Sequence, residues 1–204
     1  MKRIFYICSF GGSGSKMLCS YLKNFGKTYH IHSRRPPKKL TSITNPKNSE
    51  WFGEDILPIE ENKKTTVIFI YRNPVDAILS RFYGQGHLGN IQTDPTTTIE
   101  DVVLAKEDLY GVDEFFNNYV KAQCQDYDIY CVKYEEIFDK IEELDKALGL
   151  PSHSYLHPVK KESKYKWGTK IDKRYDLVEP LTEIYKNLIH KMDNMPFIKL
   201  HKGG

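Results

Sequence analysis

The stretch Ser9-Phe10-Gly11-Gly12-Ser13-Gly14-Ser15-Lys16 joins an apolar run, Ile4–Ser9, to a segment with helical spacing that ends before Gly26. A continuous apolar run is typical of a buried parallel strand. A glycine-rich turn that opens a helix is the geometry in which backbone N–H groups and a helix N-terminus hold a phosphate. The stretch therefore predicts a strand–loop–helix unit with an anion site at the turn. The alternative is a tight turn that binds nothing.

A second unit of the same kind begins at Thr65–Tyr71, the clearest strand in the sequence. Arg72 follows the strand, and Asn73 caps a helix that has Pro74 at its first position and Asp76 at its third, close to a capping box. The two units together suggest a ligand that carries phosphates at both ends.

The rest of the chain continues the alternation. A short strand is expected over Thr28–His32 and another over Ile129–Tyr134, with an irregular excursion over 33–64. Further helices are expected near Ile99–Lys106, Val112–Gln125, Glu135–Leu148 and Leu177–Met192, and a weakly structured Lys-rich segment over 157–174. The fold class is α/β, a three-layer parallel sheet with helices on both faces, in one domain over residues 1–204. Ligands of such sheets bind at the carboxyl ends of the strands.

Composition restricts the function classes. The chain has 204 residues and a net charge of +3, with no nucleic-acid motif, so we expect no nucleic-acid partner. Its cysteines form no C-x-x-C pair and are expected to be free thiols in a reducing compartment. The apolar run at the N-terminus is too short for a signal peptide, and no run is long enough to span a membrane. We therefore expect a cytoplasmic protein that does not bind a membrane.

The first loop is not a Walker A motif. That motif needs Gly-Lys-Ser/Thr, in which the hydroxyl holds Mg²⁺. Here Ser15 precedes Lys16 and Met17 follows it. The loop therefore predicts a metal-free phosphate cradle, and a nucleotide or small-molecule kinase is kept as an alternative.

Arg72-Asn73-Pro74-Val75-Asp76, with Ser80 four residues later, resembles the 3′-phosphate motif of the PAPS-dependent sulfotransferases. A guanidinium offers a charge-assisted fork to that phosphate and a hydroxyl adds a donor. The alternative is that Arg72 pairs with a local carboxylate. Ser13-Gly14-Ser15 resembles the 5′-phosphosulfate loop of the family, and 132–137 resembles its L-x-Y-E-D-L segment, with Tyr134 beside the adenine. The stretch 164–173 resembles the C-terminal R-K-G…W-K segment.

The resemblance implies a P-loop NTPase-like sulfotransferase fold and transfer of a sulfuryl group from PAPS to a hydroxyl or amine, without a metal, releasing PAP. The acceptor would be a small molecule or a glycan. Lys16 and His32 would be catalytic. The cofactor-binding residues would be Gly12, Ser13, Gly14, Ser15, Lys16, Met17, Arg72, Ser80, Tyr134, Lys166 and Gly168.

Two departures from the family pattern affect the chemistry. Gly12 stands where the family usually has a Lys or Arg that stabilises charge on the bridging oxygen, and Lys16 is the nearest replacement. Met17 stands where the family has a stacking Trp. The Gly12 departure keeps open a catalytically inactive protein that binds PAP or another anion.

The general base is expected on the strand-end segment that contains His30 and His32. A neutral imidazole can take a proton near pH 7, and the family spacing favours His32. Strand alternation places His30 on the same face, so it competes for the role, as do Glu54 and Asp55. Arg34-Arg35 with Lys38-Lys39 would flank the acceptor. A second basic cluster, expected near the 3′-phosphate, consists of Lys160, Lys161, Lys164, Lys166 and Lys170.

Overall fold

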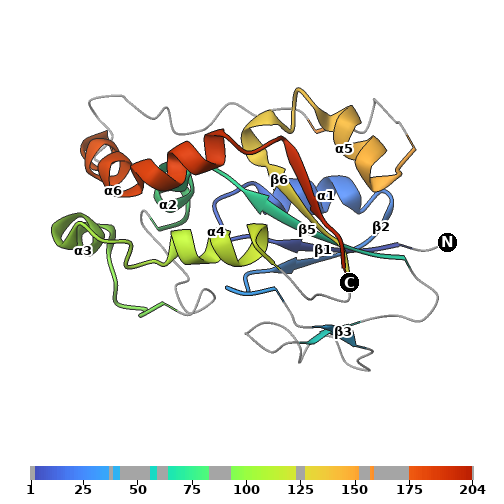
Figure 1. Cartoon of the computed structure of the whole chain (residues 1–204), viewed down its shortest axis with the longest axis horizontal. Coiled ribbons are helices and arrows are strands. Elements are labelled where there is room, and N and C mark those ends of the chain that lie inside the picture. Colours follow the sequence, from blue (N-terminus) through green and yellow to red (C-terminus); the bar gives the residue numbers. More distant parts are fainter. Residues whose placement is uncertain are drawn as a thin grey trace.

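The computed structural model describes residues 3–36, 39–41, 56–58, 64–82, 93–122, 127–151, 157–158 and 175–203, with the backbone alone at 39–41, 56–58 and 64. Its centre is a five-stranded sheet with the strand order β2-β1-β5-β6-β7 (Figure 1). The strands are β1 (Arg3–Cys8), β2 (Gly26–Ile31), β5 (Lys64–Tyr71), β6 (Ile129–Lys133) and β7 (Ile198–His201). The α/β class predicted from the alternation of strands and helices is confirmed.

Four of these strands are parallel, but β7 is antiparallel to β6, which corrects the expectation of a parallel sheet. The preceding helix, α6 (Tyr175–Asp193), ends at the carboxyl end of β6. There the Lys133 ammonium donates hydrogen bonds to the carbonyls of Asp193 and Met195. A strand that starts at this edge can only run back along the sheet, so β7 reverses direction.

Helices cover both faces of the sheet. One face packs against α1 (Ser15–Leu22) and α5 (Ile141–Leu148), and the other against α2 (Pro74–Phe82), α4 (Val112–Val120) and α6. A shorter helix, α3 (Ile99–Ala105), contacts α6. Alternation along β1 sends Phe5 and Ile7 to the first face and Tyr6 and Cys8 to the second, so both faces are apolar. The three-layer arrangement is the predicted one.

The secondary structure differs from expectation in three places. The helix expected over Glu135–Leu148 is split into a 3-10 turn, η2 (Tyr134–Glu136), and the shorter α5. The region 33–64, expected to be irregular, contains a parallel pair of short strands, β3 (Lys39–Thr41) and β4 (Ile56–Pro58). The helix expected over Val112–Gln125 ends at Val120 in α4.

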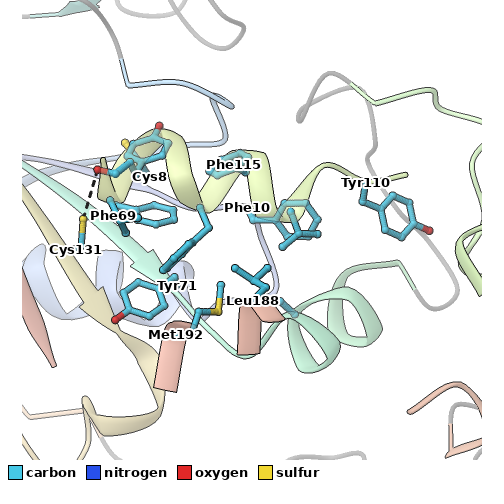
Figure 2. Packing of buried hydrophobic residues seen from close by; sticks show 14 of the residues in the cluster. Cys8, Phe10, Phe69, Tyr71, Tyr110, Phe115, Cys131, Leu188 and Met192 are labelled. Atoms are coloured by element: carbon cyan, nitrogen blue, oxygen red, sulfur yellow. Dashed lines mark hydrogen bonds between the residues drawn. The ribbon is translucent and has the colours of Figure 1, made fainter. Parts of the chain in front are cut away.

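Stacked aromatic rings form the centre of the α4 face (Figure 2). The Phe69 ring lies 4.4 Å from the Tyr119 ring and 6.0 Å from the Phe115 ring, measured between centroids. Cys131 donates its S–H to the Tyr119 carbonyl. A cavity of about 10 Å³ beside Phe115 holds at most one water, so it is part of the core and no ligand site.

Cys8, Cys19 and Cys131 are buried free thiols, as expected. Burial raises the pKa of Cys8 and of Cys131 to about 12, so neither forms a thiolate at neutral pH. Cys124 lies outside the described residues.

Phe69→Ala is expected to lower the free energy of unfolding by about 3–5 kcal/mol, because a buried ring is lost from a stack that cannot collapse into the space. Leu104→Ala is the control, since Leu104 is 85% exposed and should change stability by less than about 0.5 kcal/mol. Urea denaturation measures both. A Phe69→Ala loss below about 1 kcal/mol would contradict this account of the core.

Candidate functional site

The candidate site lies where the strand order reverses. After β1 the chain passes through α1 to β2 on one side of β1, and later returns to form β5 on the other side. In open parallel sheets this reversal leaves a crevice at the carboxyl ends of the two central strands, where ligands bind. The loop Ser9–Gly14 follows β1 and Arg72 follows β5. Both stretches singled out in the sequence therefore meet at this crevice.

The loop has an unusual backbone conformation. Gly11, Gly12 and Gly14 have φ angles of 105°, 68° and 78°, which side-chain-bearing residues rarely adopt. Gly14 is also the N-cap of α1 and provides no side chain to cap it. Consecutive residues with such angles curl the chain so that successive N–H groups point into one concavity.

The loop carbonyls accept hydrogen bonds from side chains. Arg81 Nη1 donates to the Phe10 carbonyl, and Arg72 Nη1 donates to the Gly12 carbonyl at 3.2 Å. Between them, the Ser13 hydroxyl donates to the Gly11 carbonyl at 3.2 Å. Arg72 lies just before α2 and Arg81 lies in its last turn, so the segment that contains this helix holds the loop in place.

The loop N–H groups are left available. Among the residues that the structure describes, none accepts a hydrogen bond from the backbone N–H groups of residues 11–16. These donors lie at the N-terminus of α1, whose first turn contains no acidic residue. The partial positive charge of that helix end adds to the donors. The loop is thus suited to an anion.

Arg72 lies between the loop and the end of β6. Its second guanidinium nitrogen lies 3.2 Å from the Asp76 carboxylate, and its guanidinium carbon lies 4.9 Å from the centre of the Tyr134 ring. A Cβ at Gly14 would collide with the same ring. Arg72 Nε is buried and has no hydrogen-bond partner among the described residues. Tyr134 and Arg72 therefore form one wall of the crevice, beside the loop.

The start of α2 differs from the capping box expected from the sequence. The Asn73 side-chain oxygen accepts from the N–H groups of Val75 and Asp76, as an N-cap should. The reciprocal partner of the Asn73 N–H is Glu135, at 2.7 Å, and Asp76 pairs with Arg72 instead. This contact joins the end of β6 to the start of α2.

Two histidines lie on the opposite side of the loop, at the end of β2. The Ser9 hydroxyl donates to Ser15 Oγ at 3.1 Å and lies 3.5 Å from His30 Nε2 and 3.4 Å from His32 Nδ1. The two imidazole centroids are 4.3 Å apart, which confirms that His30 and His32 share a face. His32 Nδ1 also lies 2.7 Å from the Ser9 carbonyl oxygen, which can only accept, so Nδ1 carries the proton. The lone pair of His32 is then on Nε2.

Both imidazoles are neutral near pH 7. Burial, followed by the charges of Lys16 and Arg81, lowers the pKa of His30 to about 4. Burial, followed by His30 and Arg81, lowers the pKa of His32 to about 3, against the opposing effect of the Ser9 carbonyl. Lys16 and Arg81 thus act on the same two rings, which places cationic charge on this side of the loop.

Sequence reasoning missed Arg81. Its Nη1 lies 3.5 Å from His32 Nδ1, and a Cβ at Gly11 would collide with its guanidinium. The sequence did indicate a role for Arg81, because it falls one helical turn after Ala77 on the buried, otherwise apolar face of α2. A cation at that position must either lie against a carboxylate or face a polar surface such as this loop.

The other expected site residues lie as follows. Lys16 and Ser80 are exposed, Ser15 is buried, and Met17 is half-buried and packs with the α1–α5 core. Arg34 pairs with Glu114 and donates to the Tyr110 carbonyl, so it holds the chain after β2 against α4. The expected residues outside the described ranges are Lys166, Gly168, Glu54, Asp55, Lys38, Lys160, Lys161, Lys164 and Lys170.

The comparisons with known proteins add no relative. No protein-family model, no curated protein and no solved structure gives a significant match to this chain. In the part of the chain that the structure describes, no helix is both long enough and apolar enough to cross a bilayer. Within the same residues, no three His, Cys, Asp or Glu side chains gather as metal ligands would.

Gly12→Ala is expected to destabilise the protein by about 3 kcal/mol, because the new Cβ meets the Ala77 carbonyl of α2 at a positive φ. Gly149→Ala is the matched control, since Gly149 has a φ of 61° but a Cβ there would make only an ordinary contact, 3.8 Å from Arg3 Nη2. The control should lower the free energy of unfolding by only about 1 kcal/mol, the cost of a side chain at a positive φ. Equal losses in urea denaturation would show that the loop does not pack tightly on α2.

The histidines predict an acid-labile fold. Unfolded imidazoles take up protons at about pH 6.5, whereas His30 and His32 in the folded state stay neutral to about pH 4 and 3. The unfolded state then binds more protons, so stability is complete above pH 6.5 and falls as the pH is lowered. We expect the Tm to fall by several degrees between pH 7 and 5, and by less in the variant that combines His30→Gln with His32→Gln.

His190→Gln is the control for this experiment, because His190 is exposed on α6. It should keep the pH dependence of the unaltered protein. A double variant with the same pH dependence as the unaltered protein would contradict the assignment of the two buried, neutral rings.

Proposed function

We propose that this protein is a sulfotransferase that moves a sulfuryl group from PAPS to a hydroxyl or amine acceptor and releases PAP. One observation carries the proposal: the Arg72 guanidinium at the end of β5 lies beside an N–H-lined loop at the end of β1. A cationic fork next to an amide cradle suits a ligand with two separate phosphate groups. The sequence motifs of the two segments suit the same ligand.

The proposed roles follow the strand order. The amides of Gly12, Ser13, Gly14 and Ser15, with the Lys16 ammonium, would hold the 5′-phosphosulfate. Arg72 and Ser80 would hold the 3′-phosphate, since Asp76 and Ser80 are one turn apart on α2 and Asp76 already contacts Arg72. Tyr134 would border the adenine. Met17, Lys166 and Gly168 would also contact the cofactor, as the family resemblance implies.

The width of the site suits this orientation. His32 follows β2 and Tyr134 follows β6, and these strands are three positions apart in the sheet. At the usual spacing of neighbouring strands this is about 14 Å. The nucleotide would thus extend across the strand ends, with its base at β6 and its sulfuryl group toward β2.

The transfer step uses the neutral His32. The acceptor oxygen or nitrogen attacks the sulfur as the bond from sulfur to the bridging oxygen breaks, and the electron pair of that bond stays on PAP. The acceptor proton passes to His32 Nε2, the nitrogen left free by the hydrogen bond of Nδ1 to Ser9. In the empty site Lys16 and Arg81 disfavour the protonated ring, and the negative charge of bound PAPS would offset them.

One observation favours a second candidate, a binding protein without transferase activity. Gly12 packs so closely on the Ala77 carbonyl that no side chain, and hence no loop cation, fits at this position. Such a protein would bind PAP but transfer nothing. Assay of labelled sulfate transfer from PAPS to a panel of hydroxyl and amine acceptors distinguishes the two candidates.

Arg72→Gln is expected to weaken PAP binding by about 100-fold, because it removes a charge-assisted fork to a phosphate. Isothermal titration calorimetry measures the affinity. PAP should also raise the Tm of the unaltered protein more than ATP with Mg²⁺ does, since only the ligand that fits the folded state stabilises it.

Arg3→Gln is the matched control, because Arg3 lies at the opposite end of β1 and donates to the Leu148 and Gly149 carbonyls. It should leave the PAP affinity unchanged. Unchanged affinity in Arg72→Gln, or a larger Tm increase with ATP and Mg²⁺, would refute the proposal.

A further inference from the structure

Two guanidinium groups contact the anion loop, that of Arg72 from just before α2 and that of Arg81 from the last turn of α2. Arg72 contacts the Gly12 carbonyl and the Tyr134 ring, on the side of β6. Arg81 contacts the Phe10 carbonyl and lies beside His32, on the side of β2. The two arginines therefore face different parts of whatever the loop binds.

Arg81 is held firmly in this position. Its guanidinium carbon lies 5.6 Å from the centre of the Phe10 ring and 5.3 Å from that of the Phe82 ring. Its Nη1 occupies the space that a side chain at Gly11 would need. Burial lowers the pKa of Arg81 to about 10, so the group stays charged at neutral pH. A fixed charge beside the loop costs no reorganisation when an anion arrives.

The same helix explains why the loop has no cation of its own. The Ala77 carbonyl fills the space beside Gly12, and Arg81 follows Ala77 by one helical turn. The close approach of α2 that excludes a side chain from Gly12 is thus the approach that brings Arg81 to Gly11. The positive charge is supplied by the helix instead of the loop.

We propose that Arg81 binds the sulfuryl group of PAPS and thereby distinguishes the donor from the product PAP. This inference rests on the proposed function. The sulfuryl group is the part of PAPS that must lie next to the base, and Arg81 is the guanidinium next to His32. During transfer Arg81 keeps its protons: the sulfur–oxygen bond to PAP breaks with its electron pair on PAP, and the acceptor proton goes to His32.

The consequence is a difference between two ligands that share every other contact. PAP has both phosphates but lacks the sulfuryl group that Arg81 would contact. Loss of Arg81 should therefore weaken PAPS binding more than PAP binding, whereas loss of Arg72 should weaken both ligands to a similar degree.

The test is calorimetric titration of PAP and PAPS into the unaltered protein, Arg81→Gln and Arg72→Gln at one pH and salt concentration. Because Arg81 also holds the Phe10 carbonyl, we expect Arg81→Gln to weaken both ligands, but PAPS by about tenfold more than PAP. Arg72→Gln is the matched control, a second arginine that holds a loop carbonyl, and should weaken both ligands by similar factors.

Each other outcome has a definite meaning. If Arg81→Gln weakens both ligands equally, Arg81 only supports the loop through the Phe10 carbonyl, and the inference is overturned. The inference is also overturned if neither affinity changes. An unaltered protein that binds neither ligand would overturn the proposed function itself. If Arg81→Gln does not fold, Arg81→Lys provides the same comparison, with an expected loss about threefold larger for PAPS than for PAP.

Discussion

The site depends on hydrogen bonds from two arginines to loop carbonyls, from Arg72 just before α2 and from Arg81 in the last turn of α2. The N–H of one residue and the carbonyl of the residue before it point in opposite directions across a planar peptide. When Arg81 holds the Phe10 carbonyl and Arg72 holds the Gly12 carbonyl, the N–H groups of Gly11 and Ser13 are directed away from α2. The same two bonds therefore fix the loop and turn its donors outward. Positive φ angles at Gly11 and Gly12 make this path possible without strain.

The sequence was sufficient for the parts of the fold that local chemistry determines. Uninterrupted apolar runs such as Thr65–Tyr71 identified the central strands, and Asn73-Pro74 identified the start of α2, because strand burial and helix capping depend on few neighbours. The strand β7 was not predicted, and its direction could not be predicted in this way. It depends on where α6 ends, and that end is fixed by Lys133, a residue far away in the sequence. The hydrogen bond from the Asn73 N–H to Glu135 was not predicted for the same reason, because the two residues are far apart in the sequence.

The candidate site was predictable to a similar extent. The positions of the loop, of Arg72 and of the His30–His32 pair follow from strand alternation and from the rule that parallel strands share a carboxyl edge. Arg81 was not found, because a helical cation is usually solvated and only the packing of α2 on Gly11 and Gly12 shows that this one faces the loop. The reason for glycine at position 12 also needs the structure: the obstacle is a backbone carbonyl, which no side-chain pattern reports.

The electrostatics of the empty site bear on the order of events in the proposed reaction. Burial, followed by the nearby His30, Arg81 and Lys16, lowers the pKa of the His32 imidazole and keeps it neutral. Negative charge beside such a base favours its protonated form, and PAPS would bring that charge to the loop. Binding of the donor would then raise the basicity of His32 before the acceptor reacts. On this argument, the neutral His32 beside Lys16 and Arg81 is the state of the site without the donor. Donor binding would convert it into a state that can take the acceptor proton, so proton transfer would depend on prior donor binding.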